Sequence, residues 1–300
     1  MGQEYFTKFI SIVPHHSITL DFMPSNVMIE GSCLTSHVLL CSINNNNFKN
    51  LLYYVCKLTT REWVKLPNPK SRCTTMKMAI KQYDSFHFKI IRFSWSRHNG
   101  PYTHWEIFDS KKWAWLKYNE YKKLPLFTFV YGLEVVSKGY YFHWQIIINN
   151  KKMILAFNID CENWKLISFP KHLEMLNSDF CIDKELVECE GDHGVMYSTK
   201  AWMELWIMED YSNQLWEKKY RVSLEVLNRE IPWKRLLALY TIDVALMYGF
   251  GKLIWYDCKK EVQIDVVEAQ FETIVGVHAF QSDFTPCNVL ATPSQRMMEC

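Results

Sequence analysis

The chain has 300 residues, of which 49% are hydrophobic and 22% are charged, and these fractions exclude disordered, collagen-like and coiled-coil proteins. Its 34 Lys and Arg against 32 Asp and Glu give a formal net charge of +2. That balance lacks the uniform positive field of a protein that binds nucleic acid in general, so we expect no such binding. Aromatic residues make up 15% of the chain and favour strands, because flat rings fit a pleated, half-buried surface.

Four segments along the chain share one layout of strand, polar turn, tryptophan and strand. Their tryptophans follow one another at intervals of 50, 51 and 52 residues: Trp63, Trp113, Trp164 and Trp216. A fifth segment, residues 253–264, keeps the turn and has no tryptophan. A residue four positions before the tryptophan position is expected to start the turn, because its side-chain oxygen can accept a backbone N–H two residues on: Thr59, Asp109, Asp160 and Asp257.

A period near 50 residues with several strands in each unit is typical of kelch-type β-propeller blades. We therefore predict an all-β, propeller-like fold of about six blades of antiparallel strands. Residues 1–300 form one domain in this prediction, and the repeat is strongest over residues 30–280. Strands within residues 9–22 and 273–280 are expected to complete one shared blade. Each repeat tryptophan is expected to pack between sheets while its N–H bonds to a carbonyl.

Residues 236–250 are nearly all apolar, so they are weighed as a membrane span. Asp243 lies near the centre of the stretch, which is shorter than the roughly 18 to 20 residues that a span needs. We interpret the stretch as buried strands and expect no contact with a membrane. The first 20 residues offer no apolar run long enough for a secretion signal, and the chain has no Asn-x-Ser/Thr sequon, so a cytoplasmic or nuclear location is expected.

The first repeat carries the most specific motif. Residues 55–67 read Val-Cys-Lys-Leu-Thr-Thr-Arg-Glu-Trp-Val-Lys-Leu-Pro, which resembles the Val-Cys-Asn-Pro-x-Thr-Arg-Glu-Trp-Val-x-Leu-Pro of the F-box-associated domain of plant F-box proteins. Residues 139–144, 154–158 and 205–208 are similar to further strands of that family. True kelch repeats are a poorer match, because the chain has no Gly-Gly doublet.

The resemblance implies a non-catalytic module that recognises a protein substrate for an SCF-type ubiquitin ligase. The family's F-box, which docks a Skp-type adaptor, has no counterpart in residues 1–30. A Skp-type adaptor and a cullin are therefore expected as partners only if a longer form carries an F-box. The alternative is a stand-alone propeller that binds proteins or glycans without any link to ubiquitin.

No catalytic motif for nucleotide, serine-hydrolase or zinc-protease chemistry occurs in the chain, so we expect no enzyme and no catalytic residue. The nearest grouping of metal-ligand types is Cys181, Cys189 and His193, whose spacing matches no structural zinc pattern. We therefore predict neither a metal site nor a cofactor.

Charge is uneven along the chain. Residues 63–105 hold eight Lys or Arg against one Asp, and residues 172–192 hold seven Asp or Glu against one Lys. Both stretches can be solvated loops, or each can steer a partner of opposite charge. The candidates for partner binding are three basic residues of the first stretch and two tryptophans that sugar rings could stack on: Lys70, Arg72, Lys77, Trp95 and Trp144.

Overall fold

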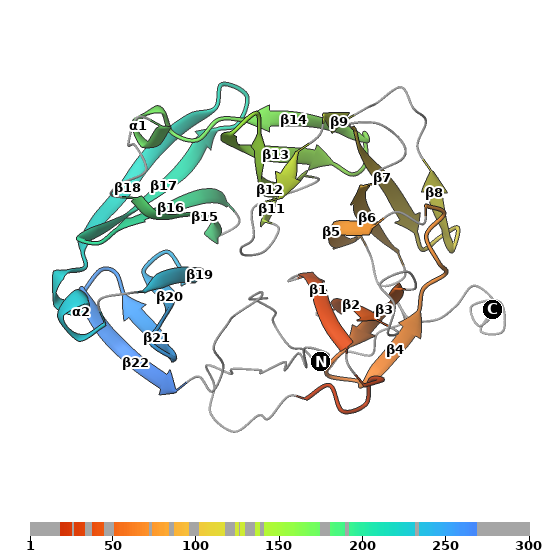
Figure 1. Cartoon of the computed structure of the whole chain (residues 1–300), viewed down its shortest axis with the longest axis horizontal. Helices are drawn as coiled ribbons and strands as arrows, with labels where there is room; N and C mark the ends of the chain where they lie inside the picture. Colours follow the sequence, from red (N-terminus) through yellow and green to blue (C-terminus); the bar gives the residue numbers. More distant parts are fainter. Residues whose placement is uncertain are drawn as a thin grey trace. The chain divides into compact units, whose positions relative to one another are not determined.

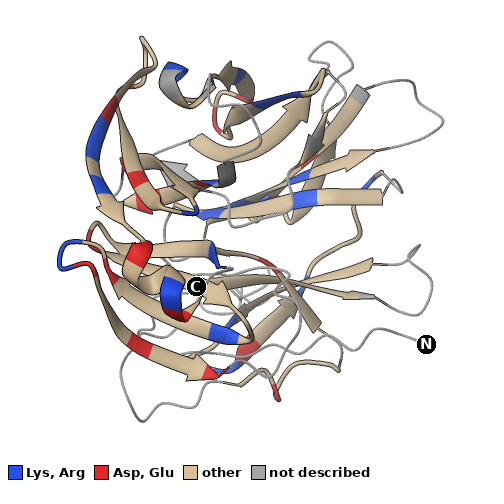
Figure 2. Cartoon of the chain, turned by 60° about the vertical axis from the view of Figure 1, so that its left-hand side comes forward, with Lys and Arg blue, Asp and Glu red and all other residues tan. Residues whose placement is uncertain are grey.

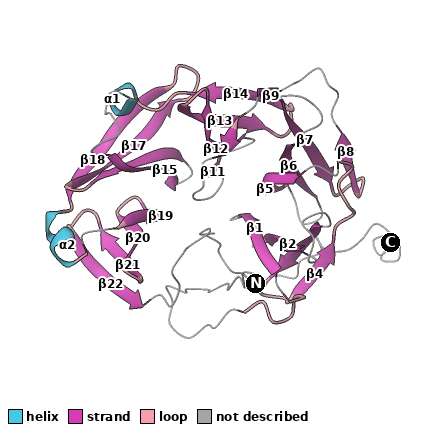
Figure 3. Cartoon of the chain, viewed as in Figure 1, coloured by secondary structure: helices cyan, strands magenta, loops and turns pink. Residues whose placement is uncertain are grey.

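The computed structural model describes residues 19–25, 27–33, 38–44, 51–71, 74–83, 87–95, 102–117, 124–125, 127–129, 136–138, 141–174, 181–189, 192–231 and 234–268. Within these residues it contains 22 strands and two short helices (Figure 3). The prediction of an all-β fold of antiparallel strands is confirmed. Neither of the two described helices is long and apolar enough to cross a membrane.

The chain divides into two compact units, the first of which holds residues 1–126 and 278–300. Its described part forms two sheets (Figure 1). Sheet 1 runs in the order β1 (Val27–Cys33), β2 (Val38–Asn44), β3 (Leu51–Lys57) and β4 (Glu62–Lys65). Sheet 2 runs in the order β5 (Thr74–Gln82), β6 (Phe88–Trp95), β7 (Tyr102–Asp109) and β8 (Ala114–Lys117), with β9 (Leu124–Pro125) paired to β7.

The second unit, residues 127–277, forms three sheets in its described part. Sheet 3 contains β10 (Thr128–Phe129), β11 (Val136–Lys138), β12 (Tyr141–Ile148), β13 (Lys151–Asn158) and β14 (Asn163–Ile167). Sheet 4 contains β15 (Cys181–Cys189), β16 (Asp192–Thr199), β17 (Trp202–Asp210) and β18 (Leu215–Ser223). Sheet 5 contains β19 (Arg235–Thr241), β20 (Val244–Gly249), β21 (Lys252–Asp257) and β22 (Val262–Glu268). Helix α1 (Lys171–Glu174) lies between sheets 3 and 4 in the chain, and α2 (Glu225–Glu230) lies between sheets 4 and 5.

Neighbouring sheets within a unit pack face to face. In the first unit Leu40 of sheet 1 belongs to the same apolar cluster as Ile90 of sheet 2. In the second unit Met203 of sheet 4 shares a cluster with Ile254 of sheet 5. Middle strands such as β16 are buried on both faces, whereas the outermost strand β18 is mostly exposed. Burial on both faces explains the nearly continuous apolar runs of the middle strands, since each face meets other side chains.

One hairpin has the same form in all five described sheets, and it joins β3 to β4, β7 to β8, β13 to β14, β17 to β18 and β21 to β22. A four-residue loop joins the strands, and its last residue has positive φ: Arg61 (56°), Trp113 (49°), Glu162 (53°), Gln214 (52°) and Glu261 (57°). In four sheets the residue before the loop accepts backbone N–H groups of the loop through its side-chain oxygen: Asp109, Asn158, Asp210 and Asp257. Because the last loop residue has a left-handed backbone conformation, the chain reverses direction there and the return strand begins directly after it.

This hairpin corrects part of the predicted repeat. Asp109 and Asp257 start their turns as predicted, but Asn158 takes the position that we expected for Asp160, and Lys57 takes the one expected for Thr59. The second residue of the return strand is a tryptophan in four sheets: Trp63, Trp115, Trp164 and Trp216. Our choice of Trp113 for sheet 2 was wrong, because Trp113 is the left-handed residue that closes the loop.

The structure describes five sheets, whereas the sequence predicted about six blades. The prediction of six came from dividing the chain length by the repeat length, which treats the residues at both chain ends as parts of blades. Of the two segments expected to share a blade, residues 273–280 and 9–18 lie outside the described residues, and residues 19–22 form no strand. Residues 236–250 form most of β19 and all of β20, as the interpretation of buried strands requires.

Candidate binding surfaces

The first candidate surface is the connection between β4 and β5 in the first unit, which carries the predicted residue Lys70. Lys70 is exposed. The backbone N–H of Ser71, the next residue, donates a 2.8 Å hydrogen bond to Oε1 of Glu106 on β7. A loop whose backbone is bonded to a strand of the sheet presents its side chains in a defined place, which a freely moving loop does not.

A buried ion pair holds this connection. Arg92 Nη1 lies 2.7 Å from Oε2 of Glu106, and the two side chains are only 3% and 2% exposed. Arg92 also donates to the carbonyl oxygen of Ser71 at 3.3 Å and, through Nε, to the hydroxyl of Thr75 at 2.8 Å. Because buried charges need both a counterion and further hydrogen bonds, the pair and the connection depend on each other.

In the sequence analysis Arg92 was one of the eight basic residues of 63–105 that were interpreted as solvated or partner-facing. For Arg92 this interpretation was wrong, because its side chain is buried. Its counterion, Glu106, lies one residue beyond that stretch. Arg92 and Glu106 are directly opposite each other on β6 and β7, so the pair is a cross-strand contact. The alternation of the two strands could have revealed it, had their register been known.

The other predicted binding residues are scattered. Trp95 ends β6 and is 36% exposed, and Lys77 is half-buried on β5. Arg72 lies outside the described residues. Trp144 is 2% exposed and packs against Phe142 and Phe129, so its selection as a surface residue was wrong: both faces of β12 are covered.

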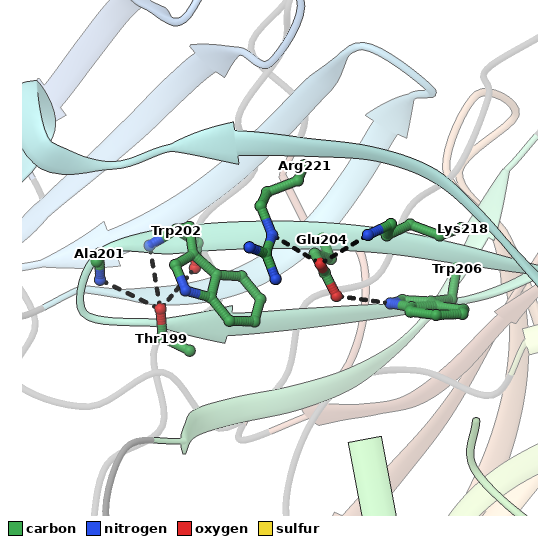
Figure 4. A network of polar contacts seen from close by, with 7 residues as sticks. All are labelled: Thr199, Ala201, Trp202, Glu204, Trp206, Lys218 and Arg221. Atoms are coloured by element: carbon green, nitrogen blue, oxygen red, sulfur yellow. Dashed lines mark hydrogen bonds and ion pairs between the residues drawn. The ribbon is translucent and has the colours of Figure 1, made fainter. Parts of the chain in front are cut away.

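The second candidate surface lies on sheet 4 of the second unit, where β17 and β18 pair (Figure 4). Trp202, Glu204 and Trp206 alternate along β17 and therefore share one face. The carboxylate of Glu204 is fully buried. It accepts hydrogen bonds from Trp206 Nε1 at 2.9 Å and from Arg221 Nε at 2.7 Å, and Lys218 Nζ lies 3.4 Å away.

A bulge in β18 makes this arrangement possible. Residues 218 and 221 are an odd number of positions apart, so in a regular strand their side chains would point to opposite faces. The register shifts between Leu205 and Trp206, which leaves Lys219 as the extra residue of β18. The shift turns Lys218 and Arg221 to the same face as Glu204.

Two tryptophans support the two cations. The guanidinium carbon of Arg221 lies 4.0 Å from the centre of the Trp202 ring, and Lys218 Nζ lies 5.8 Å from that of Trp206. Burial by itself raises the pKa of Glu204, but the hydrogen bonds from Trp206 and Arg221 and both positive charges outweigh it, so this pKa is below its usual value. An ionised, immobile carboxylate thus orients cations that are themselves 47% and 44% exposed.

Our sequence reasoning missed this surface. The signal was present in Trp-Met-Glu-Leu-Trp, residues 202–206, where alternation puts one carboxylate between two tryptophans. Basic and acidic residues are otherwise interspersed along the described strands (Figure 2). Within the described residues no three His, Cys, Asp or Glu side chains gather in a way that could hold a metal ion.

Comparison with known proteins decides the family. Residues 5–267 match the family model of the F-box associated beta propeller domain. The chain belongs to this family. The five antiparallel sheets that the structure describes are blades of a β-propeller, so the predicted fold class and the resemblance in sequence are both confirmed.

This F-box associated domain is similar to a curated plant protein and to several solved structures. The F-box protein At5g49610 of Arabidopsis thaliana is 25% identical over 294 residues, which cover 90% of this chain and 78% of that protein. Among solved structures, the β-propeller domain of Cps50 (Swd1) from Myceliophteria thermophila has a TM-score of 0.48 at 11% identity and covers 85% of this chain and 76% of its own. TolB from Acinetobacter baumannii has a TM-score of 0.42 at 9% identity, and the match covers 81% of this chain and 55% of TolB.

Proposed function

We propose that this domain binds a protein substrate for an SCF-type ubiquitin ligase and has no catalytic role of its own. The observation that carries the proposal is the family match over residues 5–267, together with a relative named as an F-box protein. The mechanism is positioning. A receptor that holds a substrate near a ubiquitin-conjugating enzyme raises the effective concentration of the substrate's lysines and needs no reacting residue.

In this proposal the target contacts loops of the propeller, and the connection that carries Lys70 is one of them. The buried pair of Arg92 and Glu106 supports this role, because it holds the backbone of the connection at Ser71. A Skp-type adaptor and a cullin join only where a longer form of the chain carries an F-box. The role places the protein in the cytoplasm or the nucleus.

The experiment is an affinity purification from plant cells of this chain joined to an F-box and of this chain alone, followed by mass spectrometry. We expect the adaptor and the cullin only with the joined form, and the same target protein with both forms. Ubiquitination of that target by the reconstituted ligase completes the test. Absence of the adaptor from the joined form, or turnover of a substrate by the purified domain alone, would contradict the proposal.

Charge reversal tests the basic connection separately. Changing Lys70, Arg72 and Lys77 to Glu should slow association with the captured target and flatten the dependence of its on-rate on salt. The matched control is Lys259→Glu in the exposed hairpin loop of sheet 5. An on-rate that is unchanged by the triple reversal removes this connection from the binding surface.

A further inference from the structure

The surface on sheet 4 has a cationic side chain with hydrogen-bond donors that no described residue of the protein accepts. Arg221 donates a hydrogen bond to Glu204 through Nε. Its two Nη groups have no hydrogen-bond acceptor among the residues that the structure describes. Its guanidinium is held on one side by the ring of Trp202. A guanidinium with fixed orientation and unused Nη donors matches the two oxygens of a carboxylate.

The charges of this surface are also unbalanced. Glu204 carries one negative charge and faces two positive ones, on Arg221 and Lys218. Of the other three carboxylates of the hairpin, Glu209 and Glu217 bond to Lys219, and Asp210 accepts hydrogen bonds from Ser212 and Asn213. One positive charge therefore stays uncompensated among these three groups, and both cations are close to half exposed.

We infer that the surface formed by Trp202, Glu204, Trp206, Lys218 and Arg221 binds a carboxylate of the protein target, and this inference rests on the proposed function. Arg221 takes the carboxylate through its Nη groups. Lys218 adds a second positive charge beside it. Glu204 contributes as a positioning residue, because it holds both cations without being accessible itself.

The charge balance favours a carboxylate over a phosphate. A phosphorylated side chain carries about two negative charges at neutral pH, and its binding sites gather several arginines. This surface offers one arginine and an excess of a single positive charge, which one carboxylate neutralises. The ligand is therefore an acidic side chain or the C-terminal carboxylate of a peptide.

The test is an array of short peptides of varied sequence, probed with the whole chain. Each sequence is displayed with Glu, Gln or phosphoserine at its central position, and a second set presents a free or an amidated C-terminus. We expect Glu to be preferred over Gln by about tenfold in affinity, which is what one charge-assisted hydrogen-bond pair contributes. A preference confined to free C-termini would assign the carboxylate to the chain end.

Two variants and a control connect the preference to this surface. Arg221→Gln should abolish the preference for Glu, and Arg221→Lys, which keeps a counterion for buried Glu204, should reduce it while the circular dichroism spectrum stays unchanged. The control is Arg229→Gln on the exposed side of α2, which should keep the preference in full.

Three results overturn the inference: no preference for Glu over Gln, a stronger preference for phosphoserine, or an unaltered preference in Arg221→Lys. The inference and the proposed function fail separately. A negative array together with intact capture of the target contradicts only the carboxylate site, whereas a selective array without recovery of the adaptor contradicts only the link to the ligase.

Discussion

Trp115 and Pro67 are 48 residues apart in the chain, and Trp115 Nε1 donates a 2.7 Å hydrogen bond to the carbonyl oxygen of Pro67. Trp216 repeats this contact with the carbonyl oxygen of Ser168 at 3.2 Å and the same separation. In both cases the outer strand of one sheet is joined to the segment that leaves the outer strand of the preceding sheet. A carbonyl that has left its sheet has no ladder partner, so the indole satisfies it.

Replacing Trp115 by Phe should lower the free energy of unfolding by about 1–3 kcal/mol, because the Pro67 carbonyl loses its donor and the smaller ring leaves space. Urea denaturation followed by circular dichroism measures the change. Trp63→Phe is the matched control, since Trp63 has the same position in sheet 1 and is 42% exposed. Equal losses for the two variants would show that the hydrogen bond to Pro67 contributes nothing.

The left-handed residues of the hairpin loops are a source of strain. Glu261 has φ of 57°, a conformation that costs a residue with a Cβ about 1–2 kcal/mol and costs glycine almost none. After the greater unfolded-state entropy of glycine and the loss of the exposed 3.1 Å hydrogen bond from the Ser223 N–H to Glu261 Oε1 are subtracted, Glu261→Gly should raise the free energy of unfolding by up to about 0.5 kcal/mol. Lys259→Gly, in the same loop without positive φ, should lower it. Thermal unfolding of both variants decides between these signs.

The buried pair on sheet 2 should respond differently to single and double replacement. Arg92→Leu leaves Glu106 buried without its counterion and should cost about 3–5 kcal/mol, whereas replacing both by Leu should cost much less. The single variant loses the hydrogen bond from Arg92 to the Ser71 carbonyl, and the double variant also loses the one from the Ser71 N–H to Glu106, so limited proteolysis should cut the β4–β5 connection faster in both than in the parent. A double variant as unstable as the single one would contradict this account.

Acid should weaken sheet 4 through Glu204. Its pKa is lower in the folded chain than in an unfolded one, so its ionised form contributes stability above the unfolded value of about 4.3, and this contribution is lost as the pH falls through the folded value. The melting temperature of Glu204→Gln should therefore fall less steeply below about pH 4.5 than that of the parent. Parallel curves in this range would assign the acid sensitivity to other carboxyl groups.

Fold class and family could be predicted from the sequence because they depend on local patterns. The motif around Trp63 and the regular return of a turn and a tryptophan indicated repeated antiparallel sheets without any knowledge of contacts. Which residue of each repeat takes which position in its hairpin could not be predicted in the same way. Trp113 and Trp115 flank Ala114, and only the backbone conformation of the loop shows that Trp115 is the one on the strand.

The chain's composition and repeat were thus enough to determine an all-β propeller, whereas both candidate surfaces were decided by tertiary structure. Arg92 and Glu106 meet through strand register, and Lys218 and Arg221 share a face through a bulge. Register and bulges are set by the packing of whole sheets, and a shift of one residue moves a side chain to the opposite face. Charge counted along the chain therefore could not identify which cations are buried and which face a partner.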